Sequence, residues 1–252
     1  MTPELKVYWR PGCSSCVKVK EYLTQQGVAF QSIDVSARPE AMKDLLAFGV
    51  KTVPVVARGG EFVFAQALED VSRFIGRKFD SQRLPPQQLV DKWLAVLRSA
   101  QRHAMQIPAA RLGERAVESR DRSIRDLAYH VYQIPDAFLQ AVENGVQDLT
   151  TTYNAPPPAG VVSTQDIQSY GKNVTAHLER WWSQLQDKSC RQTVKTYYGE
   201  RPLHELLERC TWHSAQHARQ IIAVLERLGV EPTGRLTTAD YAGLPMPQGL
   251  WE

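Results

Sequence analysis

The sequence predicts two domains, an α/β domain followed by an all-α four-helix bundle. Short apolar runs alternate with amphipathic stretches over residues 5–75, periodicity is lost over residues 77–87, and four long amphipathic stretches follow. Short β-branched runs indicate buried strands, whereas apolar residues spaced three and four apart indicate helices. The length of 252 residues also exceeds the usual size of one domain. We therefore place the domains at residues 1–77 and 87–252, with a linker at 78–86.

The first domain is predicted to run β-α-β-α-β-β-α. Gly59 and Gly60 lie between two β-rich runs and fit a tight hairpin, while Gly27 and Gly49 stand where helices should end. A mixed sheet of about four strands covered by helices can bury a modest core. The predicted strands are 5–9, 30–35, 53–58 and 61–65, and the predicted helices are 15–27, 39–48 and 68–75.

Cys13 and Cys16 form a Cys-x-x-Cys pair that follows the first strand and begins the first helix. The free amides and the dipole of a helix N-terminus stabilise a thiolate, so Cys13 should attack and Cys16 should resolve. Arg10 and Lys18 add positive potential. Half a zinc site would need a second Cys or His pair nearby, and a structural disulfide would need a secreted context, for which we see no signal peptide. The pattern therefore favours a redox dithiol.

Residues 6–76 resemble a glutaredoxin, through the Cys13 to Cys16 motif, the Thr52-Val53-Pro54 tripeptide and the Gly59-Gly60 hairpin. The resemblance implies a thioredoxin-like fold, a cis bond before a catalytic Pro54, and a thiol-substrate surface. Arg10, Thr52 and Val53 would form this surface, and a low-molecular-weight thiol or a protein disulfide would be the partner. One departure is that Phe64-Ala65-Gln66-Ala67-Leu68 replaces the Gly-Gly-Asp type of motif that holds glutathione. The sequence leaves four possible substrates or partners for the dithiol: glutathione, another small thiol, a protein disulfide and the second domain.

Four amphipathic stretches define the second domain, at residues 87–106, 123–143, 164–185 and 203–228. Such a pattern is typical of a four-helix bundle. The proline-rich stretch 155–160 should connect the second and third helices, and residues 192–198 should form a short extended segment. The tail at 236–252 lacks helical periodicity, so we expect it to be irregular.

Two histidines, His213 and His217, lie four residues apart on the apolar stripe of the last helix. This spacing lets two imidazoles bind one metal ion, and His130, beside the apolar stripe of the second helix, could supply a third. The alternative is that these histidines are core residues bonded to carbonyls. Cys210, one turn before His213, is either a thiol near the metal or a packing residue.

The second domain resembles the DinB-like superfamily over most of residues 87–229, with residues 126–138 and 203–229 matching its second and fourth helices. The resemblance implies a divalent metal ion held by His130, His213 and His217. Zinc, nickel and iron are not distinguished, because imidazole suits each. It also implies transferase or lyase-type chemistry that uses a small thiol and a small electrophilic substrate, and it allows a homodimer.

The composition is that of an ordinary globular protein, with 43% hydrophobic and 23% charged residues. The net charge of +3 is too weak for a nucleic-acid partner, and no apolar run is long enough to cross a membrane. We expect a cytoplasmic protein with Cys190 and Cys210 reduced. The combined prediction is a thiol-disulfide oxidoreductase domain that reduces or supplies the thiol used by a metal-dependent transferase. The alternatives are a disulfide reductase with a metal-binding or sensing module, and a metal-dependent hydrolase.

Overall fold

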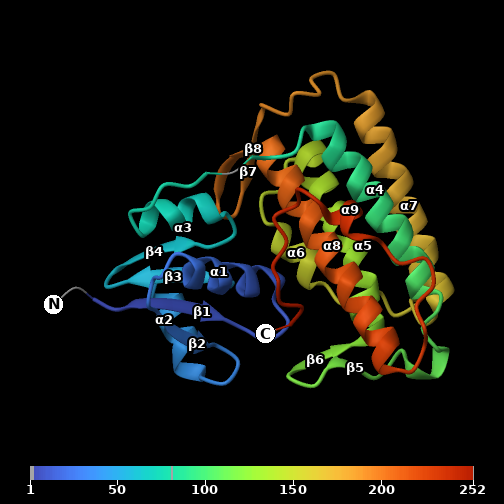
Figure 1. The fold of residues 1–252 in the computed structure, drawn as a ribbon, viewed down its shortest axis with the longest axis horizontal. Coiled ribbons are helices and arrows are strands. Elements are labelled where there is room, and N and C mark those ends of the chain that lie inside the picture. Colours follow the sequence, from blue (N-terminus) through green and yellow to red (C-terminus); the bar gives the residue numbers. More distant parts are fainter. Residues whose placement is uncertain (1–2, 81, 252) are drawn as a thin grey trace. The chain divides into compact units, whose positions relative to one another are not determined.

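The computed structural model describes residues 3–80 and 82–251 and divides into two compact units (Figure 1). The first holds the residues up to Gln82 together with those from Pro247 onward, and the second is Arg83–Met246. The last residues therefore group with the first unit, although we expected them in the helical domain. The reason is local, because Glu21 of the first unit accepts hydrogen bonds from the backbone of Gln248 and Gly249.

The first unit is built on a four-stranded mixed sheet in the order β2-β1-β3-β4. Strand β1 pairs parallel to β2 and antiparallel to β3, and β3 and β4 form an antiparallel hairpin. The predicted order β-α-β-α-β-β-α is confirmed. The elements are β1 (Leu5–Trp9), α1 (Ser14–Gln25), β2 (Gln31–Asp34), α2 (Pro39–Ala47), β3 (Val55–Arg58), β4 (Glu61–Phe64) and α3 (Leu68–Phe74).

The sheet of the first unit buries side chains on both faces. Leu5 and Val7 of β1 pack in a cluster with residues of α1 and α3, whereas Tyr8 packs in a second cluster with residues of α2. Successive side chains of a strand point to opposite faces, so this alternation separates the two clusters. The result is a three-layer arrangement with helices on both sides of the sheet.

The second unit contains four long helices, at the positions predicted from the sequence. Helices α4 and α5 each pack against both α7 and α8. The aromatic rings of Trp93, Phe138 and Trp181 meet edge to face in the core, at centroid distances of 5.2 and 4.9 Å. The helices are α4 (Pro86–Ala104), α5 (Ile124–Asn144), α7 (Thr164–Gln184) and α8 (Leu203–Arg227).

Several short elements of the second unit were not predicted. They include a hairpin before α5, a short helix after it and a short helix in the tail; the extended segment near residue 195 is one strand of a second hairpin. Segments this short carry too few residues for a periodic pattern. The unpredicted elements include β5 (Arg115–Val117), β6 (Arg120–Ser123), α6 (Leu149–Asn154), β8 (Gly199–Pro202) and α9 (Thr238–Tyr241), whereas β7 (Thr193–Thr196) lies in the predicted extended segment 192–198. No helix in the described part of the chain has both the length and the apolar character of a membrane span.

Candidate redox and metal sites

Cys13 caps the N-terminus of α1, as predicted. Strand β1 ends at Trp9, and a turn with Gly12 at φ 67° leads the chain into the helix. The Cys13 Sγ accepts a hydrogen bond from the backbone N–H of Cys16 at 3.3 Å, and the two cysteines form a disulfide. Cys13 is partly exposed, whereas Cys16 is fully buried. An incoming thiol or disulfide therefore reaches the sulfur of Cys13 first.

The segment that precedes β3 lies beside the end of β1 that leads to Cys13. Tyr8 pairs with Val55, so antiparallel register places Pro54 next to the last residue of β1. The Val53-Pro54 peptide bond is cis, as the resemblance implies. Val53 and Cys13 contact the same apolar cluster. Thr52 and Arg10, both partly buried, lie in the loops that lead to β3 and to Cys13.

Two features near the dithiol were missed by sequence reasoning. The side-chain amide of Gln66 donates to the carbonyl oxygen of Val53 at 3.3 Å, and so fixes the loop that carries Pro54. The Lys20 ammonium lies 4.1 Å from the ring centroid of Trp9, the last residue of β1. Gln66 belongs to the stretch that departs from the glutathione-binding motif, and its position in that stretch is the only sequence signal it carries.

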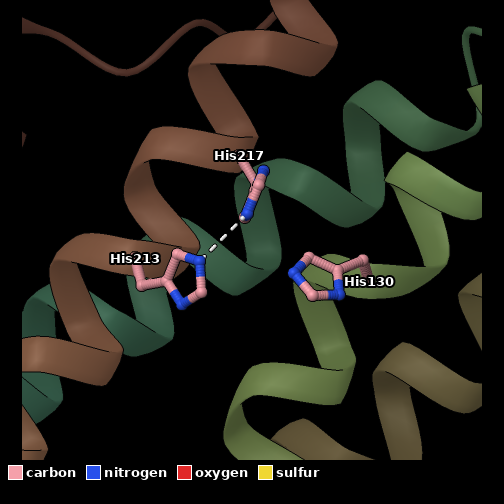
Figure 2. A group of neighbouring side chains, drawn as sticks. All are labelled: His130, His213 and His217. Atoms are coloured by element: carbon pink, nitrogen blue, oxygen red, sulfur yellow. Dashed lines mark hydrogen bonds between the residues drawn. The ribbon is translucent and has the colours of Figure 1, made fainter. Parts of the chain in front are cut away.

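In the second unit, α5 and α8 bring His130, His213 and His217 together (Figure 2). One ring nitrogen from each histidine lies within 4.8 Å of the others. The Nε2 atoms of His213 and His217 are 3.2 Å apart. All three side chains are buried, with exposed fractions of 7, 8 and 1% respectively. Helical spacing aligns the α8 pair, and packing of α5 against α8 adds His130.

Two buried glutamines orient the rings of this histidine cluster. The Nδ1 of His130 lies 3.3 Å from Gln133 Oε1, and the Nδ1 of His217 lies 2.6 Å from Gln220 Oε1. The amide nitrogen of Gln133 donates to the carbonyl oxygens of Thr152 and Ala155, so its oxygen must accept from the ring. The proton of His130 is thereby held on Nδ1, which leaves the lone pair of Nε2 toward the cluster. Each glutamine follows its histidine by three residues, a spacing that could have identified it.

The electrostatic setting of the histidine cluster favours neutral imidazoles. Burial lowers the pKa of His130 and His217 well below the usual value, and the positive charge of Arg122 lowers both further. Neutral imidazole is the form that binds a metal ion. Three such nitrogens fit a divalent ion with positions left open for another ligand.

Cys210 is not part of this ligand group in the described residues. Its Sγ lies 3.7 Å from the hydroxyl of Tyr153, which also accepts a hydrogen bond from Arg209 at 3.2 Å. The ring of Tyr153 packs edge-on against His130 and His213. Burial raises the pKa of the Cys210 thiol. The residue is therefore connected to the histidines through Tyr153 and stays a protonated thiol at neutral pH.

A partly exposed cysteine that caps a helix, with a second cysteine buried behind it, defines a thiol-disulfide oxidoreductase domain of the thioredoxin-like class. Comparison with known proteins agrees, because residues 5–63 match the glutaredoxin family. The chain belongs to the thioredoxin-like proteins, and residues 5–63 lie in its glutaredoxin domain.

Three relatives illustrate the match. The N-acetyl-S-hydroxy-L-cysteine reductase of Bacillus subtilis is 45% identical over 60 residues, which are 22% of this chain and 63% of the relative. The SPbeta prophage-derived thioredoxin-like protein YosR of Bacillus subtilis is 33% identical over 69 residues, 27% of this chain and 76% of that protein. The glutaredoxin-like protein NrdH of Lactococcus lactis is 29% identical over 59 residues, 23% of this chain and 81% of that protein. The chain thus spans less than two thirds of the first relative.

Proposed function

We propose that this protein couples a dithiol oxidoreductase domain to a helical domain that uses a divalent metal ion and a small thiol. The observation that carries the second half is the convergence of three buried imidazole nitrogens within 4.8 Å of one another. Their origin, one from α5 and an i, i+4 pair from α8, supports membership of the DinB-like superfamily. The tether between the domains raises the effective concentration of the dithiol for any thiol that the helical domain consumes.

The redox half follows the usual exchange between thiols and disulfides. The Cys13 thiolate attacks one sulfur of a substrate disulfide, forming a mixed disulfide and releasing the other sulfur as a thiolate. The Cys16 thiolate then attacks Cys13, which releases the second substrate thiol and leaves the Cys13 to Cys16 disulfide. Two molecules of a low-molecular-weight thiol return two electrons and two protons and are themselves oxidised to a disulfide.

The name of one relative suggests the kind of substrate. The first of the three relatives, the N-acetyl-S-hydroxy-L-cysteine reductase, is named for the reduction of a small oxidised thiol. We therefore include oxidised small thiols among the substrates of the dithiol, beside disulfides. Glutathione is not favoured over other small thiols as a substrate, because the stretch Phe64 to Leu68 lacks the motif that usually binds it.

In the helical half, His130, His213 and His217 would hold the metal ion. Bound there, a divalent ion lowers the pKa of a thiol or water that it coordinates. Gln133 and Gln220 hold two of the rings in the required orientation, and burial of the cluster limits competition from bulk water. The substrate would be a small electrophile to which the thiol is transferred.

Elemental analysis of the purified protein beside two activity assays tests the proposal. We expect about one divalent ion per chain in the wild type, thiol transfer to chlorodinitrobenzene with a small thiol, and reduction of hydroxyethyl disulfide. His213→Ala should lose the ion and the thiol transfer but keep disulfide reduction. Cys13→Ser should keep the ion and the thiol transfer but lose disulfide reduction.

Three outcomes would change the proposal. Transfer that survives removal of the metal contradicts it. A protein that binds the ion but consumes no electrophile with any thiol has a metal-binding or sensing module in place of a transferase. Substrate hydrolysis by Cys13→Ser without added thiol would instead indicate a metal-dependent hydrolase.

A further inference from the structure

Residues Gln248 and Gly249 are held on helix α1 by one carboxylate. Glu21 Oε2 accepts a hydrogen bond from the backbone N–H of Gln248 at 2.8 Å, and Oε1 accepts one from Gly249 at 2.6 Å. Hydrogen bonds with an ionised partner are about twice as strong as neutral ones. Both oxygens of a single side chain therefore bind the N–H groups of two consecutive residues.

An apolar contact accompanies these hydrogen bonds. Val17 of α1 is only 5% exposed. Gly249 packs against it so closely that an added Cβ would lie 3.2 Å from Val17 Cγ1 and 3.1 Å from Glu21 Oε1. A side chain at this position would therefore require Val17 or Glu21 to shift by a few tenths of an ångström, and a branched side chain would require more.

This contact lies on the side of α1 that leads to the reactive sulfur. The backbone N–H of Val17 donates to the carbonyl oxygen of Cys13, so Val17 is one turn from the dithiol. Residues 13, 17 and 21 are spaced four apart and therefore follow one side of the helix. A polypeptide that presents a disulfide to Cys13 and continues along this side of α1 would meet residues 248 and 249.

We infer that the C-terminal segment 247–251 is a specificity element that limits the dithiol to small disulfides and oxidised small thiols. A small disulfide needs access only to the sulfur of Cys13, whereas a protein disulfide also needs room for its flanking chain, which the segment occupies on α1. This inference rests on the proposed function of the dithiol and names its substrate class. It assigns Glu21 and Gly249 the role of holding the segment.

Point variants of the full-length protein test the inference. Gly249→Val and Glu21→Ala should each raise the rate of insulin disulfide reduction by about five- to tenfold. Loss of the contact increases the population of the state in which residues 247–251 are detached from α1. Reduction of hydroxyethyl disulfide should change by less than about twofold. Gly60→Val and Glu61→Ala are matched controls: Gly60 has no atom within 4 Å of an added Cβ, and Glu61 is exposed on β4.

A labelling assay keeps the test independent of turnover. In the reduced protein, a polyethylene-glycol maleimide should modify Cys13 faster in both variants than in the wild type, while iodoacetamide should react at an unchanged rate. Mass spectrometry locates the label. Equal changes for small and large reagents, or no change for either, would overturn the inference. Failure of the wild type to reduce any disulfide would instead contradict the proposed redox function, and the labelling result would still decide the role of the segment.

Discussion

At the residue scale, the orientation of the histidine rings depends on their outer hydrogen bonds. Gln133 is locked by two backbone carbonyls, and this lock decides which nitrogen of His130 faces the cluster. Gln220 performs the same task for His217 at 2.6 Å. Groups of this kind set the tautomer and raise the basicity of a metal ligand. The glutamines are therefore as informative about the site as the histidines themselves.

Replacing one of these glutamines should weaken metal binding without abolishing it. Gln220→Leu removes the acceptor for His217 Nδ1, so we expect the dissociation constant of Zn²⁺ to rise roughly 10–100-fold. Competition with a chromophoric chelator measures this change. Gln101→Leu is the control. It removes the hydrogen bond that Gln101 of α4 donates to Thr175 of α7, and it should leave the dissociation constant of Zn²⁺ unchanged. Equal effects of the two variants would contradict a specific role for Gln220.

The different exposures of the two active-site cysteines predict different variant behaviour. Cys16→Ser should retain the attacking thiol and accumulate a mixed disulfide between Cys13 and a small thiol, because no resolving thiol follows. Cys13→Ser should form none, since Cys16 is fully buried. Intact-protein mass spectrometry after treatment with an oxidised small thiol distinguishes the two. Accumulation of the adduct on Cys16 in place of Cys13 would reverse the assigned roles.

At the element scale, close packing of α5 against α7 holds the helix that carries His130. Gly171 of α7 lies against the ring of Tyr132, which is fully buried on α5. An added Cβ at Gly171 would come within 2.8 Å of that ring. The absence of a side chain at Gly171 therefore allows the two helices to approach this closely.

Gly171→Ala should destabilise the helical unit. Overpacking of a buried site costs about 1–3 kcal/mol, which exceeds the gain of roughly 1 kcal/mol from the better helix propensity of alanine. Urea unfolding followed by circular dichroism measures the net loss. The control is Gly160→Ala, where an added Cβ meets no atom within 4 Å. Increased stability of Gly171→Ala would show that Tyr132 moves aside at little cost.

At the scale of the whole molecule, each unit has its own core and its own candidate site. The dithiol lies at the strand-to-helix junction of the first unit, and the histidines lie between two helices of the second. The chain crosses between the units twice, near residues 82 and 246. A ligand that binds one site should therefore stabilise mainly the unit that contains it.

Removal of the metal by a chelator should lower the unfolding temperature of the helical unit only. An ion present at 100 times its dissociation constant stabilises its unit by about 2.7 kcal/mol, which chelation removes. Differential scanning calorimetry with and without chelator measures the shift, and His213→Ala should show no further change on chelation. An equal shift in the transition of the glutaredoxin domain would contradict the separation of the two sites.

Much of the fold could be predicted from the sequence because its signals are local. The order of strands and helices in the first unit and the four long helices of the second follow from local patterns over 4 to 25 residues. Short elements such as α6 were missed, although α6 supplies Tyr153 beside the histidines and Thr152 beside Gln133. Six residues are too few to show a helical pattern, so only packing against α5 reveals this helix.

The sequence by itself determined the dithiol and two of the three histidines of the cluster. Cys13 and Cys16 are placed by a strand-to-helix junction, and His213 and His217 by the pitch of one helix, so spacing along the chain was sufficient. The sequence offered His130 as a third member, and the tertiary structure brings its ring within 4.8 Å of the other two. Only the tertiary structure decided that Cys210 contacts Tyr153 and that Gln248 and Gly249 lie on α1. These contacts join segments far apart in the sequence, and their geometry depends on how whole elements pack, which no local pattern records.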